Sequence, residues 1–380
     1  MIVIGLGAMG SAITFHLVRR GARVLALDQF ALAHDRGSSH GVTRIMRHAY
    51  YNAPAYVPLV KRAQSLWHEL EEITGKVLFV PTGGISLGTR GARIVRGALL
   101  SAHRFGLEHE VLDASEIQKR FPALRLSPDM VGVRDPSAGL LLAEDAIRAH
   151  VAAAQAQGAE VRFNQTVTDW RAKPTGVEVH TNRSVHLGDR LVVAAGAWMP
   201  KLVTSVPLPL AVTRQVVGWF ETNDPPLYEP SRLPIWLLQP PGDHDYYYGL
   251  PRFGPPGLKV GRMHHRQPTV SPATMDRDAH NDDEAILRKC LVRYFPGANG
   301  QALALKTCMF TSTPDGHFII DKHPAHANVL ILSACSGHGF KFAPVVGEIA
   351  ANLILDGQTH HDIQMFRIDR FDEMGSDPLG

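Results

Sequence analysis

The chain has 380 residues, more than one usual domain, and its 45% hydrophobic and 20% charged content is typical of a globular enzyme. Its 39 basic and 36 acidic residues leave a net charge of +3, which is too small to indicate a nucleic-acid or membrane partner. No apolar run reaches the roughly 18 residues of a membrane span and three cysteines are too few for a disulfide framework, so we expect a two-domain cytoplasmic protein that acts on a small molecule.

A glycine-rich loop opens the chain. Its GxGxxG pattern consists of Gly5, Gly7 and Gly10. The loop lies between an apolar strand at residues 1–4 and a stretch with helical spacing at residues 11–20. A second predicted strand, residues 23–28, ends in Asp28, where a carboxylate meets a ribose hydroxyl in dinucleotide sites. This arrangement predicts an adenine dinucleotide site and leaves NAD and FAD as alternatives.

The elements that follow alternate between helix and strand. Residues 34–51 are polar and carry histidines, and we interpret them as a site loop. Apolar spacing predicts a helix over residues 56–74 that stops at Gly75. Pro, Gly and β-branched residues from 77 to 88 indicate that the chain crosses into a different layer. A second helix is predicted over residues 143–157.

The central part of the chain reads as β-structure. A hairpin at residues 177–187 leads into a buried strand at 190–195 that ends in a glycine turn at 196–198. Strand-like pieces separated by Pro and Gly then predict an antiparallel sheet, at residues 212–221, 235–239, 245–250 and 258–264. From residue 307 the chain returns to the first domain, where a strand, a glycine-rich turn and a helix at 343–355 recur.

Three segments are more specific than the glycine loop: GSSHGVTRIMRHAY at residues 37–50, CMFTSTPDGHFIID at 308–321 and SGHGFKF at 336–342. With these segments the chain resembles, nearly end to end, the monomeric sarcosine oxidase and N-methyltryptophan oxidase family of flavoprotein amine oxidases. The resemblance implies an α/β fold: a discontinuous, Rossmann-like FAD domain joined to a mostly antiparallel substrate domain. It also implies that a secondary α-amino acid, N-methyl or cyclic, is oxidised and O2 is reduced to H2O2.

We expect the FAD domain to comprise residues 1–80, 140–205 and 305–380, and the substrate domain residues 81–139 and 206–304. The family suggests a monomer with no nucleic-acid or membrane partner. Two other functions stay open. One is a flavin dehydrogenase that passes electrons to an acceptor other than oxygen, and the other is a nucleotide-binding sensor without turnover.

Five basic residues are predicted to act at the reactive end of the site. Arg47 and Lys341 match the family's substrate-carboxylate anchors, with arginine suited to a bidentate grip and lysine to a point charge. Lys259 matches the lysine that activates oxygen, because a fixed cation stabilises developing superoxide. By resemblance, Arg44 and His40 line the flavin face or the entrance, and together with Lys259 they are expected to be catalytic.

The predicted substrate pocket departs from the family pattern at two positions. Tyr248 matches the pocket tyrosine and is expected to bind substrate and assist catalysis, although its tyrosine neighbours at 246 and 247 could substitute. Phe310 stands where the better-known oxidases have a tyrosine. Met263 aligns with a family histidine, and His264 and His265 follow it, so a register shift could restore the imidazole. The identity of the secondary amino acid is therefore left open.

The resemblance also places the cofactor contacts. The expected FAD-binding residues are Gly5, Gly7, Gly10, Asp28, Ser38, Thr43, Arg44, Gly196, Trp198, Cys308, Gly337, Gly339, Phe340 and Lys341. Cys308 falls where the family carries the cysteine that forms a thioether to the flavin, with Cys335 as the competing thiol. Of the twenty histidines, pairs such as His360-His361 lack a second ligand cluster at metal spacing, so we expect no metal.

Overall fold

A six-stranded sheet forms the first layer of the fold in the computed structural model, which describes residues 1–266 and 268–374. Its strands, in spatial order, are β19 (Ile319–His323), β20 (His326–Ser333), β13 (Leu191–Val193), β1 (Ile2–Ile4), β2 (Leu25–Leu27) and β9 (Glu160–Arg162). Neighbouring strands pair in parallel except β19 and β20, which are antiparallel. The sheet therefore joins the two ends of the chain to its middle.

Both faces of this sheet are buried, which explains why its strands read as unbroken apolar runs. Val3 and Val192 pack on one side with four helices, whereas Ile2 and Leu191 belong to the core on the other side. The helices are α1 (Ala8–Arg19), α2 (Tyr56–Thr74), α5 (Ala143–Ala156) and α8 (Ala343–Leu355). The other side is covered by α6 (Met199–Leu202) and by an antiparallel sheet of β10 (Val167–Lys173), β11 (Gly176–Thr181) and β12 (Val185–Gly188).

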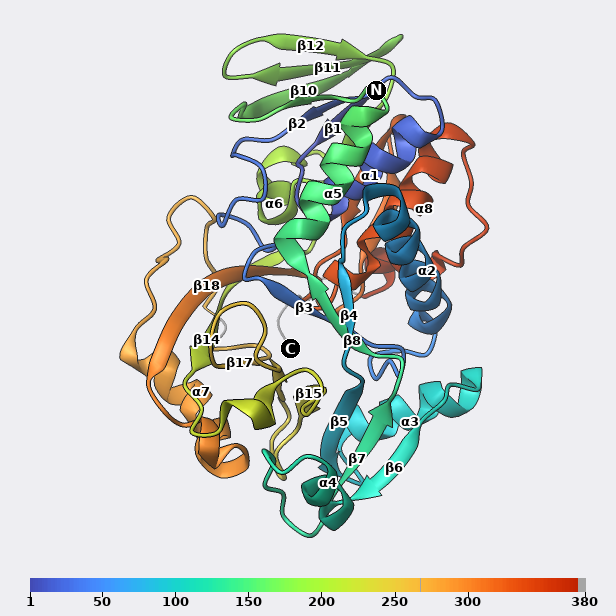
Figure 1. Cartoon of the computed structure of the whole chain (residues 1–380). Helices are drawn as coiled ribbons and strands as arrows, with labels where there is room; N and C mark the ends of the chain where they lie inside the picture. Colours follow the sequence, from blue (N-terminus) through green and yellow to red (C-terminus); the bar gives the residue numbers. More distant parts are fainter. Residues whose placement is uncertain (267, 375–380) are drawn as a thin grey trace.

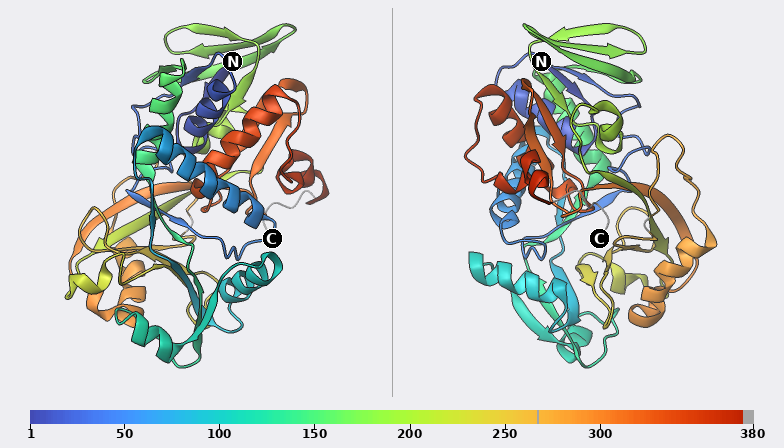
Figure 2. Two further views of the ribbon diagram at one scale, coloured as in Figure 1. Left: turned by 45° about the vertical axis from the view of Figure 1, so that its right-hand side comes forward. Right: turned by 180° about the vertical axis from the view of Figure 1, so that it is seen from behind.

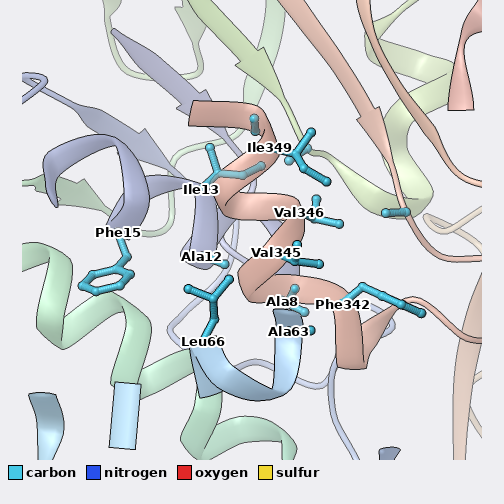
Figure 3. Close-up of a cluster of buried hydrophobic side chains, with 14 of the residues drawn as sticks. Ala8, Ala12, Ile13, Phe15, Ala63, Leu66, Phe342, Val345, Val346 and Ile349 are labelled. Atoms are coloured by element: carbon cyan, nitrogen blue, oxygen red, sulfur yellow. The ribbon is translucent and has the colours of Figure 1, made fainter. Parts of the chain in front are cut away.

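Helices α1 and α8 approach each other closely. Ala12 and Ile13 of α1 lie in one apolar cluster with Val346 of α8 and Leu66 of α2 (Figure 3). A methyl group added at Gly347 of α8 would lie 2.8 Å from the backbone of Ala12. The two helices that begin next to the nucleotide loop and the SGHGFKF turn are thus fixed against each other.

An eight-stranded sheet forms the second half of the molecule. Its strands, in spatial order, are β18 (Ala302–Ser312), β14 (Ala211–Phe220), β17 (Leu258–Arg262), β16 (Tyr247–Leu250), β15 (Ile235–Leu238), β5 (Gly84–Thr89), β7 (Met130–Asp135) and β6 (Glu110–Asp113). All neighbours are antiparallel except β15 and β5, which run in parallel. The same half of the molecule contains helices α3 (Arg93–Phe105), α4 (Ala114–Arg120) and α7 (Asn281–Tyr294).

A small sheet of β3 (Thr43–Met46), β8 (Gly139–Leu142) and β4 (Phe79–Pro81) connects the two halves. Figures 1 and 2 show the six-stranded sheet with its helices in the upper half and the large sheet below. Short 3₁₀ helices complete the fold: η1 (Gly196–Trp198), η2 (Pro225–Tyr228), η3 (Pro296–Ala298), η4 (Phe340–Phe342), η5 (Gln364–Phe366) and η6 (Ile368–Met374). No helix among the described residues is both long and apolar enough to cross a membrane.

The predicted α/β class with a mostly antiparallel second sheet is confirmed. Helix α2 has its predicted bounds, and Gly75 ends it with φ +64°. The interpretation of residues 34–51 as a loop differs from the structure in one part, because Thr43–Met46 form strand β3 and pair with β8. Four residues with polar and apolar side chains mixed are too few for a strand period to be recognised.

Candidate active site

Among residues 1–266 and 268–374, side chains from both main sheets line one large cavity of about 560 Å³. Its lining runs from Gly7 and Asp28, next to β1 and β2, to Lys259 of β17 and Cys308 of β18. A cavity of this size is in the range of ligand and cofactor sites. Every site residue predicted from the sequence lines it except Gly10.

Each glycine of the first loop has a different local surrounding. Gly5 has φ +93°, and a Cβ there would lie 2.5 Å from the carbonyl oxygen of Ala194 at the end of β13. A Cβ at Gly10 would lie 1.7 Å from the Gly5 carbonyl oxygen, so this glycine lets α1 pack onto the loop. A Cβ at Gly7 would meet Ser39 Oγ at 3.4 Å and otherwise face the cavity. Gly7 is therefore where a ligand phosphate can approach the backbone at the start of α1.

Asp28 is positioned by the same loop. Its Oδ2 accepts a hydrogen bond from Leu6 N at 2.7 Å, and its Oδ1 accepts one from Phe30 N at 2.9 Å. Burial raises the pKa of Asp28, although these backbone hydrogen bonds partly oppose that effect. The fixed carboxyl group lines the cavity at the end of β2, where a ribose hydroxyl would be bound.

His40 supplies a second observation that favours a bound ligand. Both of its ring nitrogens are buried, and neither has a hydrogen-bond partner among the residues that the structure describes. Burial and then the nearby charge of Arg44 lower the pKa of His40 to about 4, so the ring is neutral near pH 7. Buried polar atoms are rarely left unpaired in folded proteins. The glycine loop, Asp28 and His40 together fit an extended, polar cofactor such as FAD.

Lys259 is 3% exposed and connects the large sheet to the loop before β3. Its Nζ donates hydrogen bonds to Gly41 O at 2.6 Å and Thr43 O at 2.9 Å, and it lies 5.0 Å from the centre of the Trp219 ring. Burial and then the charge of Arg44 lower the pKa of Lys259 well below its usual value. Its hydrogen-bond partners in the described chain are neutral oxygens, and the nearby carboxylate of Glu144 partly opposes the lowering of its pKa.

Glu144 holds this loop from the first turn of α5 and was not predicted. Its carboxylate accepts hydrogen bonds from Gly41 N at 2.7 Å and Val42 N at 3.0 Å. Val42 has φ +68°, which is rare for a β-branched residue and requires such support. An acidic residue in a first helical turn is too common to have indicated this role from the sequence.

Arg44 is held almost entirely by backbone oxygens. Its guanidinium donates to Ser38 O at 2.9 Å and to Thr43 O at 2.9 Å. It also lies 5.6 Å from the centre of the Phe340 ring, in the SGHGFKF segment. The side chain therefore contacts both the N-terminal loop and the C-terminal turn. Arg44 also lines the cavity.

Arg47 and Lys341, from distant parts of the sequence, meet at the ring of Tyr50. Arg47 Cζ lies 4.4 Å and Lys341 Nζ 5.4 Å from the centre of that ring. Both cations are 5% exposed, and their described hydrogen bonds go to uncharged groups, Ala49 O and Asn52 Oδ1 for Arg47 and His338 O for Lys341. Burial and then the charge of Arg47 lower the pKa of Lys341 well below its usual value. This arrangement predicts an anion site, because two cations that repel each other gain most from a shared carboxylate.

Tyr50 and His338 support this pair and were missed by sequence reasoning. His338 Nε2 lies 3.0 Å from Gly316 O and must donate to it, so Nδ1 accepts the 2.6 Å hydrogen bond from the Tyr50 hydroxyl. Lys341 Nζ donates to His338 O at 2.7 Å. Burial and then the charge of Lys341 lower the pKa of His338 to about 3. Both residues lie in the quoted motifs, but only the tertiary contacts reveal their roles.

The wall beside the cation pair is apolar. Met263 and Phe310 meet at Gly337, where a Cβ would lie 2.5 Å from Met263 Cε and 2.8 Å from Phe310 Cε2. Tyr246 and Tyr248 complete this wall. The hydroxyl of Tyr246 accepts a 2.7 Å hydrogen bond from the hydroxyl of Tyr51.

The neighbouring residues considered in the sequence lie elsewhere. His265 is fully buried against Asp283, with its Nε2 2.9 Å from Oδ1, and His264 contacts Asp245 at 3.1 Å. Neither histidine lines the cavity, whereas Met263 does, so a register shift does not restore the imidazole. Tyr247 points to the opposite face of β16, where its hydroxyl donates to Ile286 O at 3.2 Å.

Two of the three cysteines line the cavity. Cys308 of β18 is 7% exposed, and burial raises the pKa of its thiol. Cys335 is less buried, and its Sγ accepts a 3.4 Å hydrogen bond from Thr311 N. The structure therefore brings both candidate thiols to the site.

One group of three potential metal ligands occurs within the described chain, Glu348, His360 and His361, with ligand atoms within 4.8 Å of one another. Glu348 already binds His361 at 2.8 Å and the guanidinium of Arg62 at 2.6 Å. A cation here would have to compete with that guanidinium. The group lies away from the cavity lining.

The fold and the cavity define a flavin-dependent oxidoreductase. Residues 1–353 match the model of the DAO family, described as FAD dependent oxidoreductase, and the chain belongs to this family. It is 42% identical to a monomeric sarcosine oxidase of Streptomyces avermitilis, over 96% of each chain. It is 34% identical to an N-methyl-L-tryptophan oxidase of Yersinia pestis, over 98% of this chain and 99% of the other. The structure of an L-proline dehydrogenase from P. horikoshii shares the fold, with a TM-score of 0.85 at 21% identity over 98% and 97% of the chains.

Proposed function

We propose that this protein is an FAD-dependent oxidase of secondary α-amino acids, N-methyl or cyclic, that reduces O2 to H2O2. The observation that carries this proposal is the pair Arg47 and Lys341, two buried cations without an acidic partner in the described chain, in the cavity that begins at the dinucleotide loop. An anionic substrate group satisfies both of them.

In this site FAD supplies the hydride acceptor, and the chain binds and orients the substrate. The carboxylate lies between Arg47 and Lys341, which limits rotation of the substrate and holds its carbon–hydrogen bond in one orientation. The same positive charges disfavour protonation of the substrate amine. The neutral amine has the free electron pair that loss of hydride requires, and the resulting imine is hydrolysed in water.

Lys259 is the residue we propose for the oxygen step. Its position, 3% exposed and without an acidic partner in the part of the chain described, supports stabilisation of a developing superoxide charge. Such a role favours an oxidase over a dehydrogenase that uses another acceptor.

We also propose that Cys308 carries the flavin through a thioether to its 8α carbon. Forming this bond would remove the thiol hydrogen and one methyl hydrogen of the flavin, and O2 would take up the two electrons. Cys308 is buried in the cavity wall and supports this assignment. Acid precipitation should leave the yellow colour in the pellet for the native protein and for Cys335→Ser, and release it for Cys308→Ser. Release from the native protein would exclude covalent attachment.

The division into an FAD domain (1–80, 140–205 and 305–380) and a substrate domain (81–139 and 206–304) is our proposal as well. Its support is that the six-stranded sheet draws its strands from the first set and seven strands of the large sheet, with the start of the eighth, come from the second. We propose a cytoplasmic monomer, in keeping with three cysteines that form no disulfide within residues 1–266 and 268–374.

A peroxide-coupled screen of secondary amino acids tests the function. At least one should produce H2O2 and should bleach the flavin spectrum when oxygen is excluded. Anaerobic bleaching without peroxide in air would identify a dehydrogenase instead. No bleaching by any secondary amino acid would contradict the proposal.

A further inference from the structure

The pocket beside Arg47 and Lys341 is lined by side chains of one chemical kind. Met263, Phe310 and Tyr246 belong to the same apolar cluster, with Leu237 on β15. All four line the cavity. Gly337, at φ +74°, packs against Met263 and Phe310 and connects this wall to the turn that carries Lys341. This part of the cavity wall therefore offers a thioether, aromatic rings and aliphatic carbon to a substrate.

Few polar groups in this wall are free to bind a substrate. The hydroxyl of Tyr246 accepts from that of Tyr51 and keeps only its own hydrogen to donate, and the two imidazoles that follow Met263 are engaged elsewhere. The Tyr248 hydroxyl is the other polar group of this wall, and it has no hydrogen bond to any residue in the described ranges. Its ring crosses over Gly261, where a Cβ would lie 2.4 Å from Tyr248 Cζ, so the ring position is fixed.

No negative charge compensates a second cation at this end. Among the described residues, Asp28 is the acidic side chain in the cavity lining, and it lies beside the dinucleotide loop. A basic substrate side chain would therefore meet the charges of Lys341 and Arg47 without a counter-ion. A hydroxyl or amide group would lose its water and find only the hydroxyls of Tyr246 and Tyr248 as side-chain partners in this wall.

We propose that the site selects secondary amino acids with apolar substituents, and that Met263 and Phe310 determine this specificity. The inference rests on the proposed function and names its substrate class. It follows from the apolar surface that these two residues form beside the cation pair, and from the lack of a carboxylate there in the described chain. Discrimination comes from the cost of burying an unpaired polar group rather than from size.

Shape-matched substrate pairs test this on the flavin-loaded enzyme. The pairs are N-methyl-2-aminobutyrate with N-methylserine, and N-methylleucine with N-methylasparagine. The second-order rate constant for anaerobic flavin reduction should favour the apolar member of each pair by about 10- to 100-fold, the range for a pocket that meets one misplaced polar group. Equal rates, or a preference for the polar member, would overturn the inference.

Two variants locate the effect. Phe310→Tyr and Met263→Gln each place a polar group on the wall and should reduce the preference severalfold, whereas Met263→Leu, which keeps the wall apolar, should retain it. The FAD content of each variant reports whether it folds with its cofactor. If Met263→Leu and Met263→Gln changed the ratio equally, Met263 would not determine specificity.

A binding experiment keeps this inference separate from the proposed function. Butyrate and 3-hydroxypropionate have the same shape and carry the carboxylate but no amine, so they bind without turnover. Their dissociation constants, measured from changes in the flavin absorbance, should favour butyrate by about tenfold or more. If no amino acid is oxidised but butyrate is preferred, the proposed function fails and the apolar selection stands. If amino acids are oxidised and 3-hydroxypropionate binds equally well, only the selection fails.

Discussion

Three basic side chains of the site are buried without a carboxylate to neutralise their charge. Lys259, Arg47 and Lys341 are each at most 5% exposed, and in the described structure they contact carbonyl oxygens and aromatic rings rather than carboxylates. Taking a cation out of water without a counter-ion costs free energy. We expect bound ligands to offset this free-energy cost, because an anionic group would interact favourably with the buried cations.

Replacing Lys259 by methionine tests one of these charges. Reoxidation of the reduced flavin by oxygen should fall by about 100-fold or more, because the cation that stabilises superoxide is lost. Reduction of the flavin by substrate should change only a few-fold. Rapid-mixing measurements of the two half-reactions check this.

Lys306→Met is the matched control, since Lys306 is an exposed lysine on strand β18 of the same sheet, separated from the strand of Lys259 by β14. It should leave both half-reactions near their native rates. An equal loss in both half-reactions of Lys259→Met would show that the lysine has no particular role toward oxygen.

The lowered pKa of Lys341 predicts the pH dependence of anion binding. A group with a lowered pKa loses its proton at a lower pH than usual, so the affinity for butyrate should fall as the pH rises through a range below the ordinary lysine value of about 10.4. Lys341→Arg should move this fall to higher pH, because a guanidinium keeps its proton. Butyrate titrations at several pH values measure it, and a midpoint unchanged by Lys341→Arg would contradict the assignment.

At the scale of elements, individual glycines decide where helices pack closely and where a ligand can approach the backbone. Gly10 lets α1 pack onto the first loop, and Gly347 lets α8 pack onto α1. Gly7 differs from both, because the space at its Cβ position is the cavity itself.

Alanine at Gly7 and at Gly10 should therefore have different effects. Gly7→Ala should leave the free energy of unfolding of the apoprotein within about 0.5 kcal/mol and weaken FAD binding about tenfold or more. Gly10→Ala should lower the free energy of unfolding by about 1–3 kcal/mol, because its methyl group meets the Gly5 carbonyl. Denaturant unfolding and FAD titration in a Cys308→Ser background measure both quantities. Equal destabilisation by the two variants would refute this division of roles.

The sequence predicted elements best where a local signal ends them. Gly75 stops α2, and Asn182-Arg183 forms the turn of the β11–β12 hairpin, because these choices depend on nearby residues only. Strand β5 was recognised only as a change of layer, since its parallel partner β15 lies far along the chain. Likewise the motifs placed Arg47 and Lys341 in one site, whereas the Tyr50 ring between them depends on packing that no local pattern encodes.

At the scale of the whole molecule, the cavity joins the halves. Its walls come from the N-terminal loop, the turn at Gly196–Trp198, strands β16 to β18 and the C-terminal turn. A ligand in the cavity therefore contacts both main sheets at once, and it should stabilise them together rather than separately.

Thermal unfolding of the holoenzyme should show this coupling. At 100 times its dissociation constant, butyrate adds about 2.7 kcal/mol, which for a chain of this length raises the Tm by roughly 3 °C. The whole transition should shift without splitting. Arg47→Met should abolish the shift, while a shift confined to part of the transition would mean that the halves unfold independently.

The order of strands in the six-stranded sheet also has a consequence for synthesis on the ribosome. Strand β1 emerges first, but it lies between β2 and β13, and β13 in turn pairs with β20 near the end of the chain. Strand β1, which precedes the glycine loop, thus lacks one of its two partners until the middle of the chain has been made. The turn that carries Lys341 is synthesised later still. We therefore expect FAD to bind only after most of the chain has been synthesised.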